Sequence, residues 1–299
     1  PNHSNCGPSD VGQPSSFGRG PYVMRIDSHQ HFWDYDPAEY PWIPPGSAIH
    51  GSFKPEDLEP LLRNANIDGC IAVQARQNLR ENVYLCSLAE TSPFVQAVVG
   101  WIDLRSDDVE QQVEAFRRLP KSAGVRHVVQ DEPDSEFMAR EPFRRGIAAL
   151  KKHGLVYDIL IYAHQLPDAI RLVRDFPDQV FVLDHIAKPR IATGEIQEWA
   201  LHMREIAQYP NLSVKLSGMV TEADHQHWIT RVLEPYWNVV ADAFGPDRIL
   251  YGSDWPVIRL ASDYARWVET VSRWLKVYPS SDQEKVWGGN AKRIYLSRR

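Results

Sequence analysis

The sequence predicts a single-domain α/β protein with a (β/α)₈ barrel (TIM barrel), and three observations support this prediction. From residue 23 onward, short β-rich runs alternate with amphipathic helical patterns. The alternation occurs eight times, which is the number of units in a closed barrel. No glycine-rich phosphate loop follows the first run, and this disfavours an open doubly wound sheet, the main alternative.

The expected strands are short runs rich in β-branched and aromatic residues. They cover residues 23–27, 69–74, 95–102, 123–129, 155–161, 179–184, 211–216 and 248–253. Because they alternate with helical patterns, we expect all of them to be parallel.

The expected helices show apolar residues at helical spacing, as Leu58, Leu61 and Leu62 do in the first of them. Pro55 and Pro167 lie where the start of a helix tolerates proline. The helical segments are 55–66, 82–91, 108–119, 141–153, 166–176, 196–208, 228–244 and 264–275, and 282–296 is expected to form an extra C-terminal helix.

Residues 1–22 differ in composition from the rest, being rich in Gly, Pro, Ser and Asn. We expect them to form a flexible tail that precedes a barrel domain of residues 23–299, because such a segment buries too little surface to become ordered. The tail has no apolar core of a secretory signal. Met24 directly precedes the first strand, and one hypothesis is that it is the natural start.

The overall composition favours a cytoplasmic protein that binds a small molecule. The formal net charge is −6, and a nucleic-acid-binding protein would normally carry a basic patch. No run of about 18 apolar residues is present, so we expect no membrane span. The three cysteines, Cys6, Cys70 and Cys86, form no CxxC pair, which fits a reducing compartment and argues against a zinc ribbon.

Metal-ligating residue types follow four of the expected strands, at the barrel end where function is usually found. His29 and His31 are two residues apart in an extended segment, so their side chains should point to the same side. We expect this set to bind one divalent transition metal ion such as zinc. The candidate ligands are His29, His31, His164, His185 and Asp254.

Other polar residues near these strand ends have expected supporting roles. Asp184 is a candidate to orient a metal-ligating histidine through a hydrogen bond. The remaining histidines need no more than a solvated or capping role: His3, His50, His153, His202, His225 and His227.

The seventh strand places a lysine toward the barrel lumen. Its apolar residues Leu212, Val214 and Leu216 alternate with Ser213, Lys215 and Ser217, and we expect the apolar set to face the helices. A lysine in the lumen is costly unless it is paired or functional, so Lys215 is a candidate to stabilise an oxyanion or to contact substrate hydroxyls. A register slip of one residue would reverse this assignment.

Several residues are candidates to bind a substrate. Gln74 and Arg126 lie at the second and fourth strands; Arg126 could bind a substrate oxygen or form an ion pair with Asp131, Glu132 or a neighbour in the barrel. The segment 32–54 is too long for a plain connection and should form part of the pocket wall. The tryptophans expected to stack on sugar rings, with core packing as the alternative, are Trp33, Trp42 and Trp255, and His164 is a further substrate-binding candidate.

The sequence resembles the amidohydrolase superfamily from about Met24 to the C-terminus. The resemblance is carried by DSHQHFW (27–33), His164, DH (184–185) and GSDWP (252–256). Its sugar-lactonase branch, which contains L-fuconolactonase- and L-rhamnonolactonase-type enzymes, is indicated by YPWI (40–43), GVRHVVQDEPDSEF (124–137), DHIAKP (184–189) and VKLSGMVTEAD (214–224). The resemblance implies a (β/α)₈ barrel that hydrolyses lactones of aldonic acids.

The resemblance also bears on the metal. Some superfamily members hold two metals bridged by a carboxylated lysine on the fourth strand, but this chain has Arg126 and His127 there, so a lysine-bridged pair is not expected. Relatives that cleave aromatic-derived lactones work without a metal, which leaves metal-independent activity open.

We therefore expect hydrolysis of a sugar lactone such as L-fucono- or L-rhamnonolactone. Asp254 would take a proton from the attacking water and later give it to the ring oxygen, with His185 and Lys215 as further catalytic residues. The alternative role for Asp254 is that of a turn cap. A bound metal would polarise the carbonyl or lower the pKa of water toward about 7.

Two other functions remain open on the same barrel. One is metal-dependent decarboxylation, or hydrolysis of an aromatic-derived lactone carboxylate; a di-acid substrate would need cations such as Arg126, Lys188 and Lys215. The other is a non-catalytic barrel that binds sugar.

Overall fold

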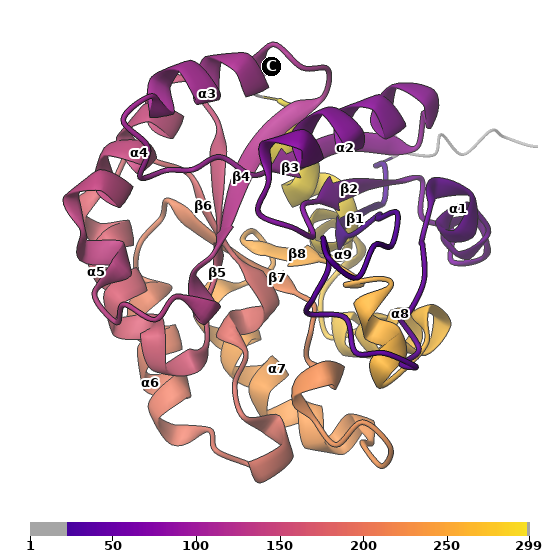
Figure 1. The fold of residues 1–299 in the computed structure, drawn as a ribbon. Helices are drawn as coiled ribbons and strands as arrows, with labels where there is room; N and C mark the ends of the chain where they lie inside the picture. The colour runs from indigo at the N-terminus through magenta and orange to yellow at the C-terminus, as the bar shows by residue number, and fades with distance from the viewer. Residues whose placement is uncertain (1–22, 298–299) are drawn as a thin grey trace, which may run out of the picture.

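Eight parallel strands, surrounded by helices, form the centre of the molecule (Figure 1). The computed structural model describes residues 23–297. The strands are ordered β1 to β8 around the sheet, so every strand pairs with its neighbour in sequence. This arrangement confirms the predicted (β/α)₈ barrel. The predicted tail, residues 1–22, lies outside the described residues.

The strands agree with the sequence prediction to within a few residues. Their bounds are β1 Ile26–Gln30, β2 Gly69–Val73, β3 Val95–Gly100, β4 Ser122–Val128, β5 Val156–Leu160, β6 Phe181–Leu183, β7 Leu212–Leu216 and β8 Ile249–Tyr251. β1 begins later than predicted and extends to Gln30, so His29 lies inside the strand instead of after it.

The helices also lie where the apolar periodicity predicts them. Their bounds are α1 Pro55–Asn64, α2 Leu79–Thr91, α3 Val109–Arg117, α4 Glu141–Lys152, α5 Leu166–Asp175, α6 Gln197–Ile206, α7 Thr230–Phe244, α8 Tyr264–Leu275 and α9 Ser280–Glu284. After α9 the chain continues as two π-helical segments, Lys285–Gly289 and Lys292–Leu296, which together form the predicted C-terminal helix. Within residues 23–297, no helix combines the length and apolar character that crossing a membrane requires.

The barrel lumen has two chemically different halves. The half near the strand N-termini is apolar and is closed by the C-terminal helix, whose Ile294 and Tyr295 pack against the lumen residues Ile26, Ile71, Val73, Ala97, Val99, Val156, Val182 and Leu250. Asp158 lies two residues after Val156, and Asp184 lies two residues after Val182. Both aspartates are fully buried. Because side chains alternate along a strand, both carboxylates also face the lumen, so its other half is polar.

Two backbone hydrogen bonds join β1 to the segment after β8 and close the barrel. The Asp254 amide donates to the His29 carbonyl at 2.8 Å, and the His31 amide donates to the Trp255 carbonyl at 2.8 Å. We call this junction the β1–β8 seam. It places Asp254 beside His29 and His31.

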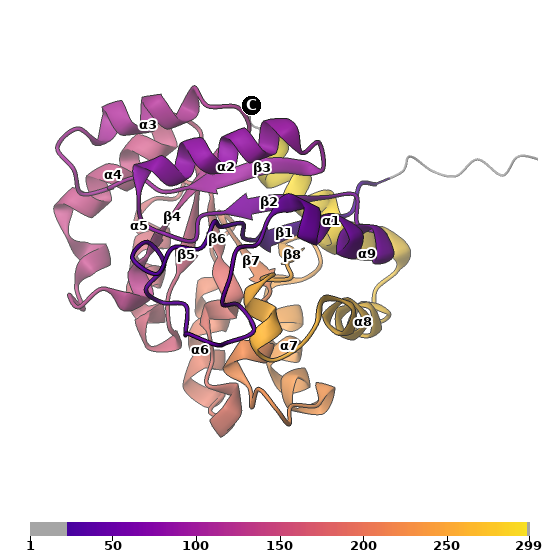
Figure 2. The same cartoon turned by 45° about the vertical axis from the view of Figure 1, so that its right-hand side comes forward.

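A long loop connects β1 to α1 and is drawn in indigo in Figure 2. Trp33 and Phe53 form an antiparallel bridge at its base, with N–O distances of 3.0 and 2.9 Å. This bridge draws the Trp33 side chain into the core, where it is fully buried and its indole N–H donates to the Gly51 carbonyl. The expectation that Trp33 stacks on a sugar is therefore not supported.

Substitution of Gly146 in α4 tests the packing between the helices and the strand ends. A Cβ at this position would lie 2.3 Å from the Leu104 carbonyl oxygen. We expect Gly146→Ala to lower the free energy of unfolding by about 1–3 kcal/mol, because a well-packed site must shift to admit the methyl group. Urea denaturation followed by circular dichroism measures this change.

Gly289→Ala is the matched control, since its Cβ would meet no atom closer than 3.4 Å. Alanine is the better helix former, so this variant should be neutral or slightly stabilised. Equal destabilisation of both variants would contradict the proposed close contact at Gly146.

Candidate active site

A cavity of about 540 Å³ lies at the C-terminal ends of the strands. His31, His185 and Asp254 line it, together with the polar residues Gln74 and Arg126. One wall is apolar and combines the β1–α1 loop with the segment after β8: Pro41, Trp42, Pro44, Ile49, Val257 and Leu260. This confirms that residues 32–54 contribute to the pocket wall.

Three imidazoles converge on one carboxylate oxygen. The Nε2 atoms of His31, His29 and His185 lie 3.2, 3.8 and 4.0 Å from Asp254 Oδ1. All four residues are at most 5% exposed. Four of the five predicted metal ligands are thus brought together.

The second nitrogen of each ring is engaged elsewhere, which fixes the orientation of the three rings. The Nδ1 atoms face different partners: the Val73 carbonyl for His31 at 2.8 Å, the Ser217 hydroxyl for His185 at 2.9 Å, and, for His29, the Lys215 ammonium at 3.2 Å and the Asp184 carboxylate at 3.3 Å. The predicted role of Asp184 as a residue that orients a histidine is consistent with this contact.

An unusual backbone turn presents His185 to the cavity. The four consecutive residues 185–188 have positive φ angles between 46° and 60°, although none is glycine. Left-handed backbone costs such residues about 1–2 kcal/mol each, and strain of this kind is concentrated at functional sites. Gly218, at φ +65°, leaves the necessary space, because a Cβ there would lie 2.6 Å from the His185 ring.

The protonation states suit metal binding or base catalysis. Burial lowers the pKa of His29 and of His185 well below the usual value, so both imidazoles are neutral at neutral pH. Burial acts to raise the pKa of Asp254, but His185 and the hydrogen bond with His31 outweigh it and lower the pKa. Asp254 is therefore ionised.

The donor set fits a transition metal ion. Ligand atoms of His29, His185 and Asp254 lie within 4.8 Å of one another, and all three residues are buried. Neutral imidazoles and a carboxylate are ligands that zinc and similar ions prefer. Arg126 Nη1 lies 3.3 Å from His29 Nε2 and competes with a metal for the same lone pair.

A fully buried charge network lies beneath the histidines. The Lys215 ammonium pairs with Asp158 and, at 3.1 Å, with Asp184; Arg126 Nη1 lies 3.2 Å from Asp184. Burial raises the pKa of Asp158 to about 6, against the opposing effect of Lys215. Burial also opposes ionisation of Asp184, but Lys215 and His29 hold its pKa well below the usual value.

The network changes the interpretation of Lys215 and Arg126. Lys215 faces the lumen as predicted, but it is 0% exposed and lies among carboxylates, so it does not reach the cavity. Arg126 lines the cavity, and its ion-pair partner is Asp184, a neighbour in the barrel, which is one of the alternatives considered from the sequence beside Asp131 and Glu132. Its Nη2 donates to the Gln74 carbonyl at 2.6 Å, which links the two predicted substrate-binding residues.

The predicted tryptophans divide into two groups. Trp42 lines the cavity, is 44% exposed, and is fixed by a hydrogen bond from its indole to the Ala75 carbonyl at 2.9 Å. Trp255 is only 3% exposed, because the β1–β8 seam turns it into the core against Phe32 and Phe53. It therefore occupies the core-packing position that the sequence left as the alternative.

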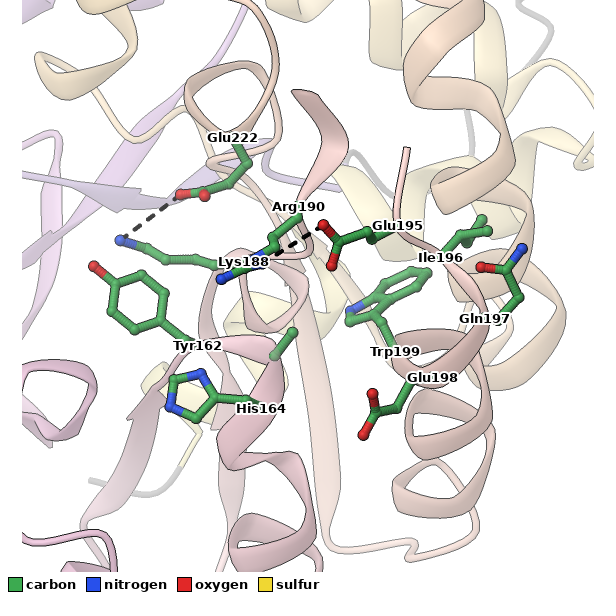
Figure 3. Close-up of a pocket in the computed structure, with 11 residues that line it drawn as sticks. Tyr162, His164, Lys188, Arg190, Glu195, Ile196, Gln197, Glu198, Trp199 and Glu222 are labelled. Carbon is green, nitrogen blue, oxygen red and sulfur yellow. Dashed lines mark ion pairs between the residues drawn. The ribbon is translucent and has the colours of Figure 1, made fainter. Parts of the chain in front are cut away.

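His164 lies apart from the other histidines. It is exposed and lines a second cavity of about 760 Å³ (Figure 3). Its ring stacks on the ring of Tyr162, with the two ring centroids 6.1 Å apart. The chain turns outward after β5 in a short helical turn, Ala163–Gln165, and this carries His164 away from Asp254. The structure therefore gives no support to His164 as a metal ligand.

Sequence reasoning missed several residues around the cavity. Asp158 could have been found by the same signal as Lys215, since it is a charged residue at a lumen-facing position of a strand. Glu222 and His225 line the cavity without a comparable signal. His225 is exposed, as expected of a solvated residue, but it also lines the cavity from the turn before α7, which begins only at Thr230.

Comparison with known proteins finds similarity to amidohydrolases in both sequence and structure. The amidohydrolase family model matches residues 26–296. L-Fucono-1,5-lactonase of Burkholderia ambifaria is 38% identical over 278 residues, which cover 91% of this chain and 96% of the relative. L-Fucono-1,5-lactonase of Burkholderia multivorans is 39% identical over 285 residues with the same coverage. The crystal structure of a Burkholderia multivorans amidohydrolase with bound zinc aligns with a TM-score of 0.87 at 39% identity, covering 91% of this chain and 99% of that one.

Removal of the Lys215 charge tests the buried network. We expect Lys215→Met to lower the free energy of unfolding by about 3–5 kcal/mol, because the fully buried Asp158 then loses its cation. Urea denaturation measures the loss. The double variant Lys215→Met/Asp158→Asn should recover part of it, since no unpaired charge remains at Asp158.

Lys285→Met is the control, because Lys285 forms its ion pairs with Asp247 and Asp282 at the surface and is 41% exposed. Surface pairs contribute about 0–1 kcal/mol. A loss for Lys215→Met no larger than that of the control would show that the network does not stabilise the barrel.

Proposed function

This chain belongs to the amidohydrolase family, and from that premise we propose that it is a lactonase that hydrolyses the lactone of a sugar acid to the open-chain aldonic acid. An aldonolactone such as L-fucono- or L-rhamnonolactone is the proposed substrate. The observation that carries the proposal is the convergence of three imidazole nitrogens on Asp254 Oδ1 at the base of a 540 Å³ cavity. The names of the relatives support the same class of substrate.

Asp254 is the proposed base. Its Oδ1 makes the contacts with the histidines, which leaves Oδ2 to accept a proton from the attacking water. Its lowered pKa keeps it ionised and ready for this step at neutral pH. Hydrolysis then forms a bond between the water oxygen and the carbonyl carbon and breaks the bond between that carbon and the ring oxygen, which takes a proton and becomes a hydroxyl.

His29, His185 and Asp254 are the proposed ligands of one zinc ion, with His31 beside them. When bound, the ion supplies a Lewis acid that polarises the lactone carbonyl. The zinc in the Burkholderia multivorans amidohydrolase structure supports this choice of metal.

The charges around the cavity favour a neutral substrate over a di-acid. Arg126 is paired with Asp184, and Arg76 lies 2.6 Å from Glu39 and 2.7 Å from Glu81. Two of the three lysine and arginine side chains that line the cavity are thus already neutralised and Lys188 remains, which argues against decarboxylation of a planar di-acid, whose two carboxylates would need two free cations. Trp42 offers an exposed ring face on which the C–H groups of a sugar can stack.

The first experiment is a pH-indicator assay of acid release from a panel of aldonolactones. Each is tested before and after chelation, with metal content measured on the same sample. Acid release from one stereochemical group of lactones is expected, and its loss together with the metal would assign the metal to catalysis. No turnover of any aldonolactone would contradict the proposed function.

Asp254→Asn tests the assignment of the base. We expect turnover of the preferred lactone to fall by about 10²- to 10⁴-fold with the fold intact, because the amide cannot take a proton from water. Asp224→Asn, an exposed position where the carboxylate pairs with His227, is the control and should leave turnover unchanged. Near-wild-type turnover of Asp254→Asn would remove it from the mechanism.

Metal uptake tests the ligand set independently of turnover. The double variant His29→Ala/His31→Ala should lose zinc binding in equilibrium dialysis followed by elemental analysis. His164→Ala should retain it, because His164 is exposed and lies on a different cavity. Unchanged zinc content in the double variant would show that the ion binds elsewhere.

A further inference from the structure

Lys188 and Glu222 form a wall between the two cavities, since both residues line the 540 Å³ and the 760 Å³ cavity. In Figure 3 the ammonium and the carboxylate point the same way, and both lie away from Trp199. Their head groups are 4.0 Å apart, which is too long for a hydrogen bond. The side chains are 19% and 22% exposed, so a ligand can reach them.

The two head groups face each other at ion-pair distance, and the Lys188 ammonium also lies over the Tyr162 ring. Among residues 23–297, neither the Lys188 ammonium nor the Glu222 carboxylate has a hydrogen-bond partner. The other charged groups at the cavity differ in this respect: Arg76, Arg126 and Asp254 are all held by close polar contacts. The pair at 188 and 222 is therefore the charged part of the wall that remains available to a substrate.

Opening of a lactone needs a proton donor as well as a base. When the bond between the carbonyl carbon and the ring oxygen breaks, its electron pair stays on the ring oxygen, which must be protonated. The sequence suggested that Asp254 returns the water proton. However, Asp254 Oδ1 already faces three imidazoles, whereas Glu222 is a second carboxyl group that lines the cavity without a hydrogen-bond partner among the described residues, so Glu222 is free to act as the donor.

We propose that Glu222 is the acid that protonates the ring oxygen as the lactone opens, and that Lys188 stabilises the carboxylate which this transfer leaves behind. The proposal rests on the proposed lactonase function. Water adds to the carbonyl carbon while Asp254 takes one proton, and the departing ring oxygen takes the proton of Glu222. One water is consumed, and after product release Asp254 loses its proton to solvent while Glu222 regains one.

The surroundings of Glu222 support this role. Burial raises the pKa of Glu222 above the usual value, Lys188 opposes this effect, Asp254 adds to it, and His225 opposes it. Tyr162, from the segment after β5, faces the pair as well, with the Lys188 ammonium 5.5 Å from its ring. Four carboxyl groups line the cavity, those of Glu39, Asp131, Glu222 and Asp254, and burial shifts the pKa of Glu222 in the direction that keeps it protonated.

The backbone fixes Lys188 relative to the histidine cluster. Lys188 ends the left-handed segment 185–188 that begins with His185. The same turn therefore presents one side chain to Asp254 and the other to Glu222. The strained turn 185–188 thus links His185, which faces Asp254, to Lys188, which faces the proposed proton donor Glu222.

The test compares pH profiles of kcat/KM for aldonolactone hydrolysis. The wild type should lose activity at high pH as Glu222 loses its proton. We expect Glu222→Gln to lower kcat by about 10²-fold with little change in KM and to abolish this alkaline limb. Lys188→Met should move the limb to higher pH, because removal of a nearby cation raises the pKa of a carboxyl group.

A change of leaving group provides a second readout. Dihydrocoumarin is an aryl lactone whose phenolate leaves without prior protonation, so Glu222→Gln should affect its hydrolysis by no more than a few-fold. Glu222→Asp should retain part of the aldonolactone activity. Glu198→Gln, an exposed glutamate that lines only the second cavity, is the control and should behave like the wild type.

The outcomes separate the two proposals. An active wild type with a Glu222→Gln variant of unchanged kcat, or of unchanged pH profile, would overturn the role of Glu222 alone. Equal losses on the aldonolactone and on dihydrocoumarin would also overturn it, because they indicate a structural defect. A wild type inactive on every aldonolactone would overturn the proposed function and, with it, this inference.

Discussion

The site depends on the two hydrogen bonds of the β1–β8 seam. They close the barrel by joining the Asp254 amide to the His29 carbonyl and the His31 amide to the Trp255 carbonyl, each at 2.8 Å. The same bonds bring a carboxylate from the end of the chain against two histidines from its beginning. Closure of the fold and assembly of the cluster are therefore one event, since an open sheet would leave Asp254 far from its partners.

The buried charges beneath the cluster hold it in place from below. Asp184 contacts His29, Lys215 and Arg126, and Tyr295 of the C-terminal helix donates to Asp158 at 2.7 Å. Two cations and two carboxylates balance, so the lumen avoids an uncompensated buried charge, which is strongly destabilising. Their contribution is orientation: they fix the His29 ring and connect the apolar base of the barrel to its reactive end.

Much of this was predictable because strands have simple rules. The period of two placed Lys215 in the lumen, and the strand-end rule found His29, His31, His185 and Asp254. Depth along the barrel axis was not predictable, so Lys215 was expected in the cavity although it lies beneath it. The paths of Trp33, His164 and Trp255 were also missed, because bridges and turns formed by distant residues determine where loop side chains point.

The left-handed turn at 185–188 shows what the site requires of the backbone. Four strained residues persist only where the surroundings over-determine them, and here Gly218 leaves space for the His185 ring while Ser217 holds its Nδ1. A relaxed turn would move His185 and Lys188 together, and would disturb both the Asp254 cluster and the contact with Glu222. The strain thus fits a cavity in which two carboxyl groups must be kept in different electrostatic surroundings, one ionised by its histidines and one kept protonated more readily by burial. A flexible loop could not maintain that difference, whereas a strained turn directly after β6, packed against Gly218 and Ser217, can.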